Sequence, residues 1–286
     1  MSIRTIFNIA QRGHVPVFQF NFSDVSQLKG IINGMKKFKK PFILGTSEGE
    51  SRFLGLDFVV AMKKEIEKEL GFPVILNLDH GKSFDYLKKA INAGYQMVHF
   101  DGSSLPFKEN IKITKKVVRY AKRKRVLVEG EIGLLRGGSG FHQEIAKVEL
   151  GDMTSPEEAK RFIKETNIDA LAPVFGNIHG VYKKMPSLDL ERLSMIKRRV
   201  GKRVFLVLHG GSGIPSYQVK EAVKRGIVKI NINTEIRIAW RRALDKILKE
   251  KLREVTPYKL MPSVVRAVEK IIDRKMRLFY KDYSRF

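Results

Sequence analysis

Three of the six histidines, His80, His179 and His209, stand directly after or shortly beyond the end of a short apolar run. Asp79 precedes the first of them, so a carboxylate and an imidazole are neighbours. Three imidazoles that converge and leave one position open are a usual ligand set of a catalytic zinc ion. A carboxylate beside such a site can act as a general base, or it can simply cap a strand end. The pattern favours a metal centre if the fold brings the three histidines together.

The other three histidines lack this placement. His99 lies inside an apolar run, which favours a position in the core. His14 and His142 follow no strand-like run. None of the three is therefore expected to bind a metal.

Two segments are suited to phosphate. His209 to Gly213 reads His-Gly-Gly-Ser-Gly, which leaves backbone N–H groups to face an oxyanion, and Ser216 marks the start of the next helix. The segment from Asn231 to Arg237 offers amide and hydroxyl groups at another helix start. Glycine-rich turns are weak evidence alone, but phosphate sites after the last two strands recur in (β/α)₈ barrels.

Eight short apolar runs alternate with segments of helical periodicity, and nearly every run ends in polar residues. The runs are 15–20, 41–45, 74–78, 97–100, 126–128 with Ile132 beyond, 170–174, 204–208 and 228–232. Eight strand–helix units in 286 residues are typical of a (β/α)₈ barrel, whose active site lies at the carboxyl ends of its strands. A doubly wound open sheet is the alternative, but it would gather such residues at one switch point. We predict one α/β domain over residues 1–286, a TIM barrel with an extra amphipathic helix at 262–279 and a basic tail.

Serines mark three of the predicted helix starts. Ser155 precedes Pro156 and two glutamates, the usual order of a capping residue, a first-turn proline and first-turn acids. Ser187 and Ser216 are interpreted in the same way.

The charge balance is strongly basic, with 55 Lys and Arg against 30 Asp and Glu, a formal net charge of +25. Such a protein attracts anions, either phosphorylated metabolites or nucleic acid. The basic residues are scattered and lack interleaved aromatic residues, which favours a solvated surface and leaves nucleic-acid binding as the weaker alternative. The chain has no cysteine, no secretory signal and no window of roughly 20 apolar residues, so we expect a cytoplasmic protein without membrane contact.

Six motifs, in order and spacing, resemble those of the class II, metal-dependent ketose-bisphosphate aldolases, from about Val15 to Phe279. They are Leu78-Asp79-His80-Gly81, Asp101-Gly-Ser-Ser-Leu-Pro-Phe107, Glu129-Gly-Glu131-Ile-Gly133, His179-Gly180-Val-Tyr-Lys183, His209-Gly-Gly-Ser-Gly-Ile-Pro215 and Asn231 to Arg237. The resemblance implies a zinc enzyme that reversibly cleaves fructose 1,6-bisphosphate into dihydroxyacetone phosphate and glyceraldehyde 3-phosphate. Tagatose 1,6-bisphosphate or another phosphorylated ketose is the alternative substrate. The resemblance also implies a homodimer or homotetramer.

The resemblance assigns roles to individual residues. His80, His179 and His209 would hold Zn²⁺, and Asp79 would transfer the proton. Asp101 and Glu131 would form a second divalent position. The dihydroxyacetone phosphate end, with Na⁺ or K⁺ beside it, would be held by Gly180, Gly210, Gly211, Ser212, Asn231, Ile232, Asn233 and Thr234. Lys183 or Arg237 would meet the far phosphate, the latter across a dimer contact. As a Lewis acid, Zn²⁺ would stabilise the enediolate formed by C3–C4 cleavage, so that no Schiff-base lysine is needed.

Four departures from the family pattern bear on the substrate and on protonation. Gln19 stands where the family usually has Asn, Asn77 where a His is common, and Asn233 where the motif has Asp. The loop at 133–140 lacks the Glu that usually protonates the carbanion. Glu144 is the candidate substitute if the loop is one or two residues longer than in relatives. These changes leave the choice of sugar and the protonating group open.

Overall fold

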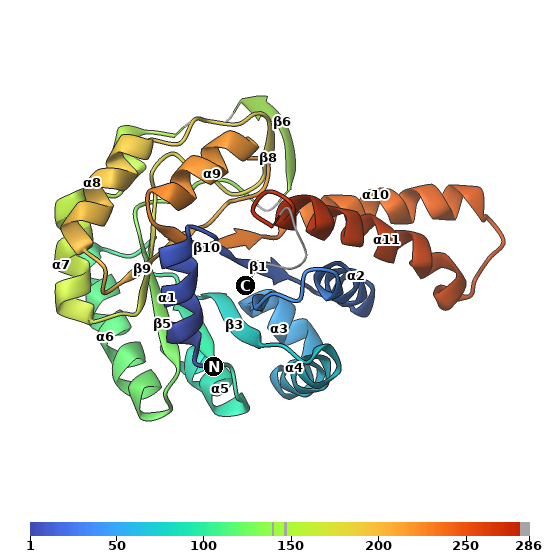
Figure 1. Ribbon diagram of the computed structural model, residues 1–286, viewed down its shortest axis with the longest axis horizontal. Coiled ribbons are helices and arrows are strands. Elements are labelled where there is room, and N and C mark those ends of the chain that lie inside the picture. The colour runs from blue at the N-terminus through green and yellow to red at the C-terminus, as the bar shows by residue number, and fades with distance from the viewer. Residues whose placement is uncertain (139, 146–147, 281–286) are drawn as a thin grey trace.

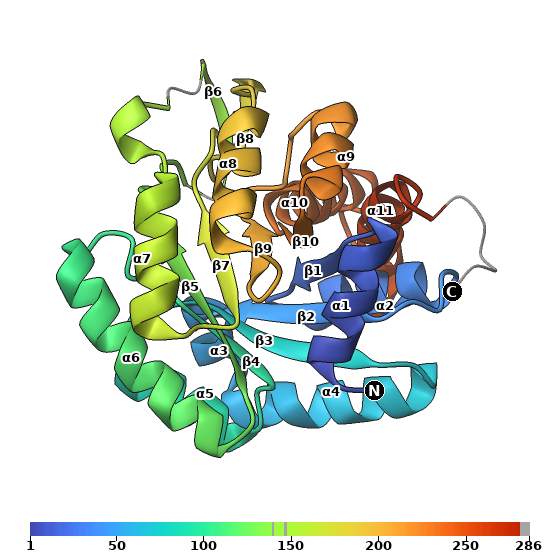
Figure 2. The ribbon, with the colours of Figure 1, turned by 60° about the vertical axis from the view of Figure 1, so that its left-hand side comes forward.

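Eight parallel strands close into a barrel with helices packed around its outside (Figure 1, Figure 2). The computed structural model describes residues 1–138, 140–145 and 148–280. In order around the barrel the strands are β1 (Val17–Asn21), β2 (Phe42–Ser47), β3 (Val74–Gly81), β4 (Met97–Phe100), β5 (Leu127–Ile132), β7 (Ala170–Pro173), β9 (Phe205–Leu208) and β10 (Ile227–Ile232), which pairs with β1. Each predicted apolar run is therefore a strand, and the predicted TIM barrel is confirmed.

The outer helices each turn an apolar stripe toward the barrel, because their apolar residues recur at a spacing of three and four. In α6, for example, Ile111, Val118 and Ala121 are buried. The helices are α2 (Val25–Lys36), α3 (Glu48–Leu54), α4 (Leu56–Leu70), α5 (Phe84–Ala93), α6 (Phe107–Arg123), α7 (Pro156–Thr166), α8 (Leu190–Val200) and α9 (Ser216–Lys224), with a 3₁₀ turn at Leu150–Asp152. No helix in the described part of the chain is long and apolar enough to cross a membrane.

The amino-terminal helix α1 (Ile3–Gly13) is an element that the sequence analysis did not predict. Its buried residues Ile6, Phe7 and Ala10 share an apolar cluster with the barrel strands, and Phe7 packs edge-on against Phe205 with ring centroids 5.2 Å apart. Ser2 caps the helix by accepting from the Thr5 N–H. The spacing of these apolar residues after a capping serine was a usable signal.

A helical hairpin of α10 (Thr234–Glu250) and α11 (Pro257–Met276) projects from the barrel, and α11 also packs against α2 (Figure 1). The predicted extra helix is present, but its predicted bounds of 262–279 are wrong. The helix begins at Pro257, because the fixed φ of proline suits a first helical position, and it continues through Pro262. The predicted basic tail falls on 281–286, outside the described residues.

A second, two-stranded sheet lies beside the barrel. Its parallel strands β6 (Phe141–Ile145) and β8 (Val181–Lys184) belong to the long connections after β5 and β7. Neither segment is an apolar run, so the sequence analysis did not predict them. The sheet ties together the two connections, one of which carries His179.

The helix caps confirm one of the three serine interpretations. The Ser155 hydroxyl accepts from the Glu158 N–H at 3.1 Å, and the Glu158 carboxylate accepts from the Ser155 N–H at 3.2 Å. The interpretation of Ser187 is wrong, because Asp189 directly precedes α8 and its carboxylate accepts from the first-turn backbone at 2.9 Å. Ser216 is itself the first residue of α9, after Pro215, so it starts the helix but does not cap it.

Candidate active site

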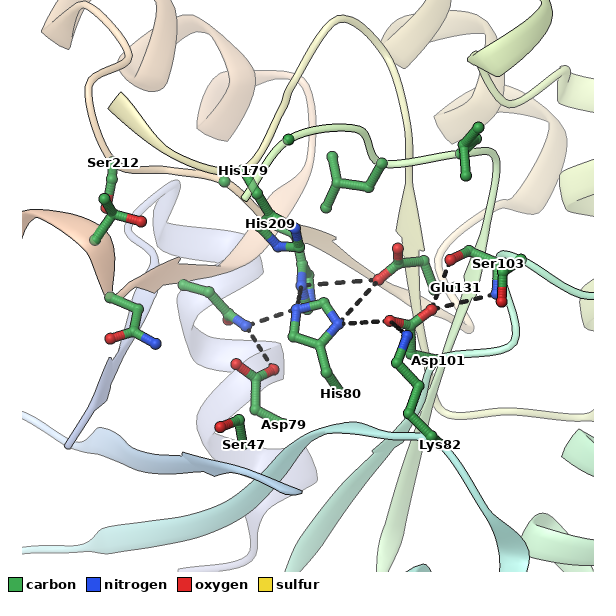
Figure 3. A pocket seen from close by; sticks show the side chains of 18 of the residues that line it. Ser47, Asp79, His80, Lys82, Asp101, Ser103, Glu131, His179, His209 and Ser212 are labelled. Carbon is green, nitrogen blue, oxygen red and sulfur yellow. Dashed lines mark hydrogen bonds and ion pairs between the residues drawn. The ribbon is translucent and has the colours of Figure 1, made fainter. Parts of the chain in front are cut away.

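A pocket of about 470 Å³ lies at the carboxyl ends of the barrel strands (Figure 3). Most of the predicted site residues line it: Asp79, His80, Asp101, Glu131, His179, His209, Gly210, Ser212, Asn231, Asn233, Thr234 and Arg237. The barrel therefore brings together side chains that are up to 158 residues apart in the sequence, from Asp79 to Arg237. Ser47, Lys82, Ser103, Ser104, Leu134, Leu135 and Gly137 complete the lining.

His80 is fixed by its hydrogen bonds at the end of β3. It has a left-handed φ of 48°, which is uncommon for a residue other than glycine and marks local backbone strain. Its Nδ1 lies 2.9 Å from Asp101 Oδ2, which also accepts from Lys82 Nζ at 2.6 Å. Because a carboxylate can only accept, the proton of a neutral His80 ring is on Nδ1, which places the lone pair on Nε2.

His209 is held in the same way from the opposite side. Its Nε2 lies 2.6 Å from Glu129 Oε1, and Glu129 Oε2 accepts from Lys229 Nζ at 2.7 Å. Glu129 and Lys229 are completely buried. Burial alone would raise the pKa of Glu129, but the charge of Lys229 and the hydrogen bond from His209 hold it well below its usual value. The ionised Glu129 accepts the His209 Nε2 proton, which leaves the lone pair on Nδ1.

The remaining ring nitrogens of His80 and His209 face each other. His209 Nδ1 and His80 Nε2 are 3.1 Å apart, and a shared cation would satisfy both, since each imidazole already donates its other ring proton to a carboxylate (Figure 3). This carboxylate–histidine arrangement is typical of metal-ligating histidines. The residues present therefore fit a divalent metal.

His179 enters the pocket from the loop after β7. Its ring centroid lies 4.8 Å from that of His80 and 6.4 Å from that of His209. Burial and the neighbouring His80 lower its pKa to about 3, so it is neutral at pH 7 and able to bind a metal. Among the described residues, the ligand atoms that already lie within 4.8 Å of one another belong to two groups: Asp79, His80, His99 and His209; and His80, Asp101 and Glu131. His179 is in neither group.

His99 is buried, as predicted, but it belongs to the wall of the site and not to an apolar core. Its Nδ1 accepts from the His80 N–H at 3.1 Å, so the proton is on Nε2, which faces Glu131 Oε2 at 3.2 Å. Glu131 Oε2 is buried, lies 3.9 Å from His80 Nδ1, and apart from this contact with His99 accepts no hydrogen bond from the described residues. A buried carboxylate oxygen with so little satisfaction suits a bound cation or water.

Asp79 lies on the other side of His80 and is held by two amides. Asn21 Nδ2 donates to its Oδ2 at 3.0 Å, and Asn231 Nδ2 donates to its Oδ1 at 3.1 Å. Burial opposes ionisation of Asp79, but the neighbouring imidazole of His80 and, further off, the charge of Lys229 hold its pKa well below the usual value. Asp79 is therefore an ionised acceptor at neutral pH.

The glycine loop after β9 reaches the pocket through Gly210 and Ser212. Gly210 has φ 64°, and a Cβ there would lie 2.0 Å from the Ile178 carbonyl oxygen, so the turn requires glycine. The Gly213 N–H is not available to an anion, because it donates to Glu235 Oε1 at 2.8 Å. Of the backbone N–H groups in the loop that was predicted to face an oxyanion, that of Gly213 is therefore already engaged.

Several of the predicted substrate-binding residues, and the candidate protonating group Glu144, lie elsewhere. Gly180, Gly211 and Ile232 are buried and do not line the pocket. Lys183 and Glu144 are exposed on β8 and β6 and do not line it either. Arg237 lines the pocket, but its Nη2 already pairs with Glu50 Oε1 of the same chain at 2.5 Å.

Two of the departures from the family pattern contact each other beneath the pocket. Asn77 Nδ2 donates to Gln19 Oε1 at 2.8 Å, and Gln19 Nε2 donates to Asn21 Oδ1 at 2.8 Å. Both side chains are completely buried, and the chain of amides ends at Asp79. The third departure, Asn233, donates to Glu50 Oε1 at 3.2 Å. An aspartate at 233 would instead place a second carboxylate against Glu50.

Sequence reasoning missed Glu129, Lys229 and Lys82 as site residues. Glu129 stands two positions before Glu131 on the same strand, and Lys229 two positions before Asn231, so the alternation of strand faces was a signal. No sequence signal pairs Glu129 with Lys229 across 100 residues, since only the closed barrel brings them together.

Comparison with known proteins agrees with this geometry. The family model described as "Fructose-bisphosphate aldolase class-II" matches residues 1–283. The chain is 38% identical over 283 residues to the fructose-bisphosphate aldolase of Geobacillus stearothermophilus, covering 98% of this chain and 96% of that one. It is 39% identical over 274 residues to the 6-phospho-5-dehydro-2-deoxy-D-gluconate aldolase of Shouchella clausii, covering 94% and 91%.

A solved structure shares the fold along its whole length. The YdjI aldolase of Escherichia coli K12 superposes with a TM-score of 0.81 at 29% identity, covering 99% of this chain and 98% of that one. The family match, the two relatives and the histidine-lined pocket at the carboxyl ends of the strands all lead to one assignment. The chain belongs to the class II fructose-bisphosphate aldolase family and is an aldehyde-lyase of the aldolase type.

Proposed function

We propose that this enzyme reversibly cleaves fructose 1,6-bisphosphate to dihydroxyacetone phosphate and glyceraldehyde 3-phosphate, with zinc held by His80, His179 and His209. The observation that carries the proposal is the facing pair of imidazole lone pairs, His80 Nε2 and His209 Nδ1, 3.1 Å apart and beside the ionised Asp79. Zn²⁺ bound there would act as a Lewis acid and stabilise the negative charge that cleavage leaves on the ketone fragment.

The chain's own residues supply the proton transfer and the positioning. Asp79 accepts the proton of the C4 hydroxyl as the C3–C4 bond breaks. Asn21 and Asn231 hold its two oxygens, so the carboxylate is already oriented before substrate binds. Glu129 and Asp101 fix the ring protons of His209 and His80, and thereby the direction in which each lone pair points.

The phosphates are bound by the loops after β9 and β10. Ser212, Asn233 and Thr234 line the pocket beside Gly210, where they can hold the dihydroxyacetone phosphate end together with Na⁺ or K⁺. Arg237 can meet the far phosphate only if it leaves Glu50. Asp101 and Glu131, which share a candidate ligand group with His80, form the second divalent position.

A second substrate class is favoured by a specific observation. One relative, 39% identical, carries the name 6-phospho-5-dehydro-2-deoxy-D-gluconate aldolase, so the family similarity alone does not choose the sugar. Tagatose 1,6-bisphosphate differs from fructose 1,6-bisphosphate at one hydroxyl, next to the bond that breaks. Discrimination among such substrates depends on a few polar contacts.

Side-by-side cleavage assays of these three substrates test the proposal. We expect the highest kcat/KM for fructose 1,6-bisphosphate, with release of dihydroxyacetone phosphate measured by a coupled dehydrogenase. The same purified protein serves as its own control across the substrates. A higher kcat/KM for tagatose 1,6-bisphosphate or for 6-phospho-5-dehydro-2-deoxy-D-gluconate would move the assignment to that compound.

A homodimer or homotetramer and a cytoplasmic location are expected from the resemblance and from the composition. The pocket suits a small phosphorylated ketose. Nucleic acid stays the weaker alternative partner, and it is considered because the net charge is +25.

A further inference from the structure

A second concave region lies at the opposite end of the barrel from the active site. It has a volume of about 460 Å³. Its lining is almost entirely basic or polar: Gln11, Arg12, His14, Ser194, Lys197, Arg198, Lys202, Lys224, Arg225 and Gly226. His14, Lys202 and Gly226 stand shortly before β1, β9 and β10, which places the region at the amino ends of the strands.

Lys197 is the central side chain of this basic pocket. Its stem packs over Gly226, where a Cβ would lie only 2.9 Å from the Cδ and Cε of Lys197 and where φ is 106°. Its Nζ is buried and has no hydrogen-bond partner among the described residues, and the same is true of Gln11 Nε2. A buried donor without an acceptor destabilises a fold unless a water or ligand completes it.

The surrounding charges are not neutralised from within the pocket. Lys224 and Arg225 both pair with Glu221, which does not line the pocket. In the part of the chain that the structure describes, Arg12, Arg198 and Lys202 form no ion pair. Burial and then the like charge of Lys202 lower the pKa of Lys197 to about 8, as expected for a cation without a counter-charge.

A plainer explanation accounts for only part of this arrangement. Lys197, Arg198 and Lys224 stand in the last turns of α8 and α9, where cations interact favourably with the helix dipole. That role needs only an exposed side chain near the last carbonyls. It does not explain why Lys197 Nζ is buried and donates to no carbonyl, in a pocket that Gln11, whose Nε2 also has no partner among the described residues, helps to line.

We infer that this basic pocket binds a phosphate-bearing anion, with Lys197 Nζ and Gln11 Nε2 donating to it and Arg12, Arg198 and Lys202 around it. Phosphate oxygens only accept, so they match a lining that offers donors and no acidic side chain. The site is separate from the aldolase pocket and does not depend on the proposed substrate. Anion binding at this site would also account for some of the basic residues behind the net charge of +25.

The test uses radiolabelled pyrophosphate in equilibrium dialysis with the intact protein. We expect two classes of site in the wild type, one in the aldolase pocket and one in the basic pocket. Lys197→Met keeps the stem and removes the donor, so it should weaken one class by about tenfold or more while fructose 1,6-bisphosphate cleavage stays unchanged. Lys164→Met, in the last turn of α7 and outside the pocket, is the matched control and should leave both classes intact.

Three results would overturn the inference. Identical isotherms for the wild type and Lys197→Met would show that the pocket binds no pyrophosphate. An equal loss in Lys164→Met would reduce the effect to general surface charge. Binding of a short RNA duplex that depends on Lys197, without such dependence for pyrophosphate, would assign the pocket to nucleic acid. Unchanged cleavage and a melting temperature no lower than that of the wild type show that the Lys197→Met variant is folded.

Discussion

Replacing Asp79 with asparagine is expected to lower kcat for bisphosphate cleavage by about 10²- to 10⁴-fold, the usual loss when a general base is removed. An amide cannot accept the C4 hydroxyl proton, whereas its size matches that of the carboxylate. The fold should tolerate the change, because Asn231 Oδ1 is without a partner and can accept from the new amide after a flip of the Asn231 side chain. The measurement is kcat together with zinc per subunit on the same preparation.

The zinc content separates three roles for Asp79. Normal zinc with a greatly reduced rate is the predicted result. Normal zinc with a rate within about tenfold of the wild type would mean that Asp79 only holds the strand end. Loss of zinc along with the rate would make Asp79 a ligand, in keeping with its place in one candidate group with His80 and His209. The same two measurements should be made on His99→Gln, because His99 belongs to the same candidate ligand group as Asp79.

Replacing Lys229 with methionine is expected to destabilise the protein by about 3–5 kcal/mol, because it leaves the buried carboxylate of Glu129 without its cationic partner. Lys229 Nζ lies 2.7 Å from that carboxylate, and both residues are completely buried. The free energy of unfolding in urea measures the loss. Zinc affinity should fall as well, because Glu129 orients His209.

Two further variants sharpen this result. Adding Glu129→Gln to Lys229→Met removes the unpaired charge, so the double variant should recover part of the lost stability. Lys246→Met is the matched control, since Lys246 pairs with Glu250 at 3.7 Å on the exposed face of α10, and it should change stability by no more than about 0.5 kcal/mol. A loss below about 1 kcal/mol in Lys229→Met would contradict the account of the buried pair.

The strands of the barrel could be predicted from the sequence because strands covered on both faces are continuous apolar runs. The strands β6 and β8 could not be predicted in this way, because they lie beside the barrel. None of the residues from Val181 to Lys184 is buried, so β8 has no apolar face. Helix α1 was not predicted for a different reason. Its apolar residues show helical spacing, but only the structure shows that they pack against the barrel strands.

The candidate site was predictable as a set of residue types but not as a network. Polar residues at strand ends converge in any barrel, which is why Asp79, His80 and His209 were found. The sequence does not show which way each side chain points or how neighbouring strands are aligned. His99 was therefore predicted to lie in the core, whereas in the structure it faces Glu131. The motif that contains Lys183 fixes its place in the sequence but not the side of β8 that it occupies, and its side chain is exposed outside the pocket.

Cleavage is expected to require a metal held by the histidine cluster, and exhaustive chelation is the decisive experiment. Metal content is measured by mass spectrometry on the same sample as the rate of dihydroxyacetone phosphate release from fructose 1,6-bisphosphate. We expect activity to disappear as the metal is removed and to return with Zn²⁺ or Co²⁺, while His179→Ala stays folded and is not rescued. Undiminished cleavage at a metal content near zero, or covalent trapping of the substrate by borohydride, would contradict the claim.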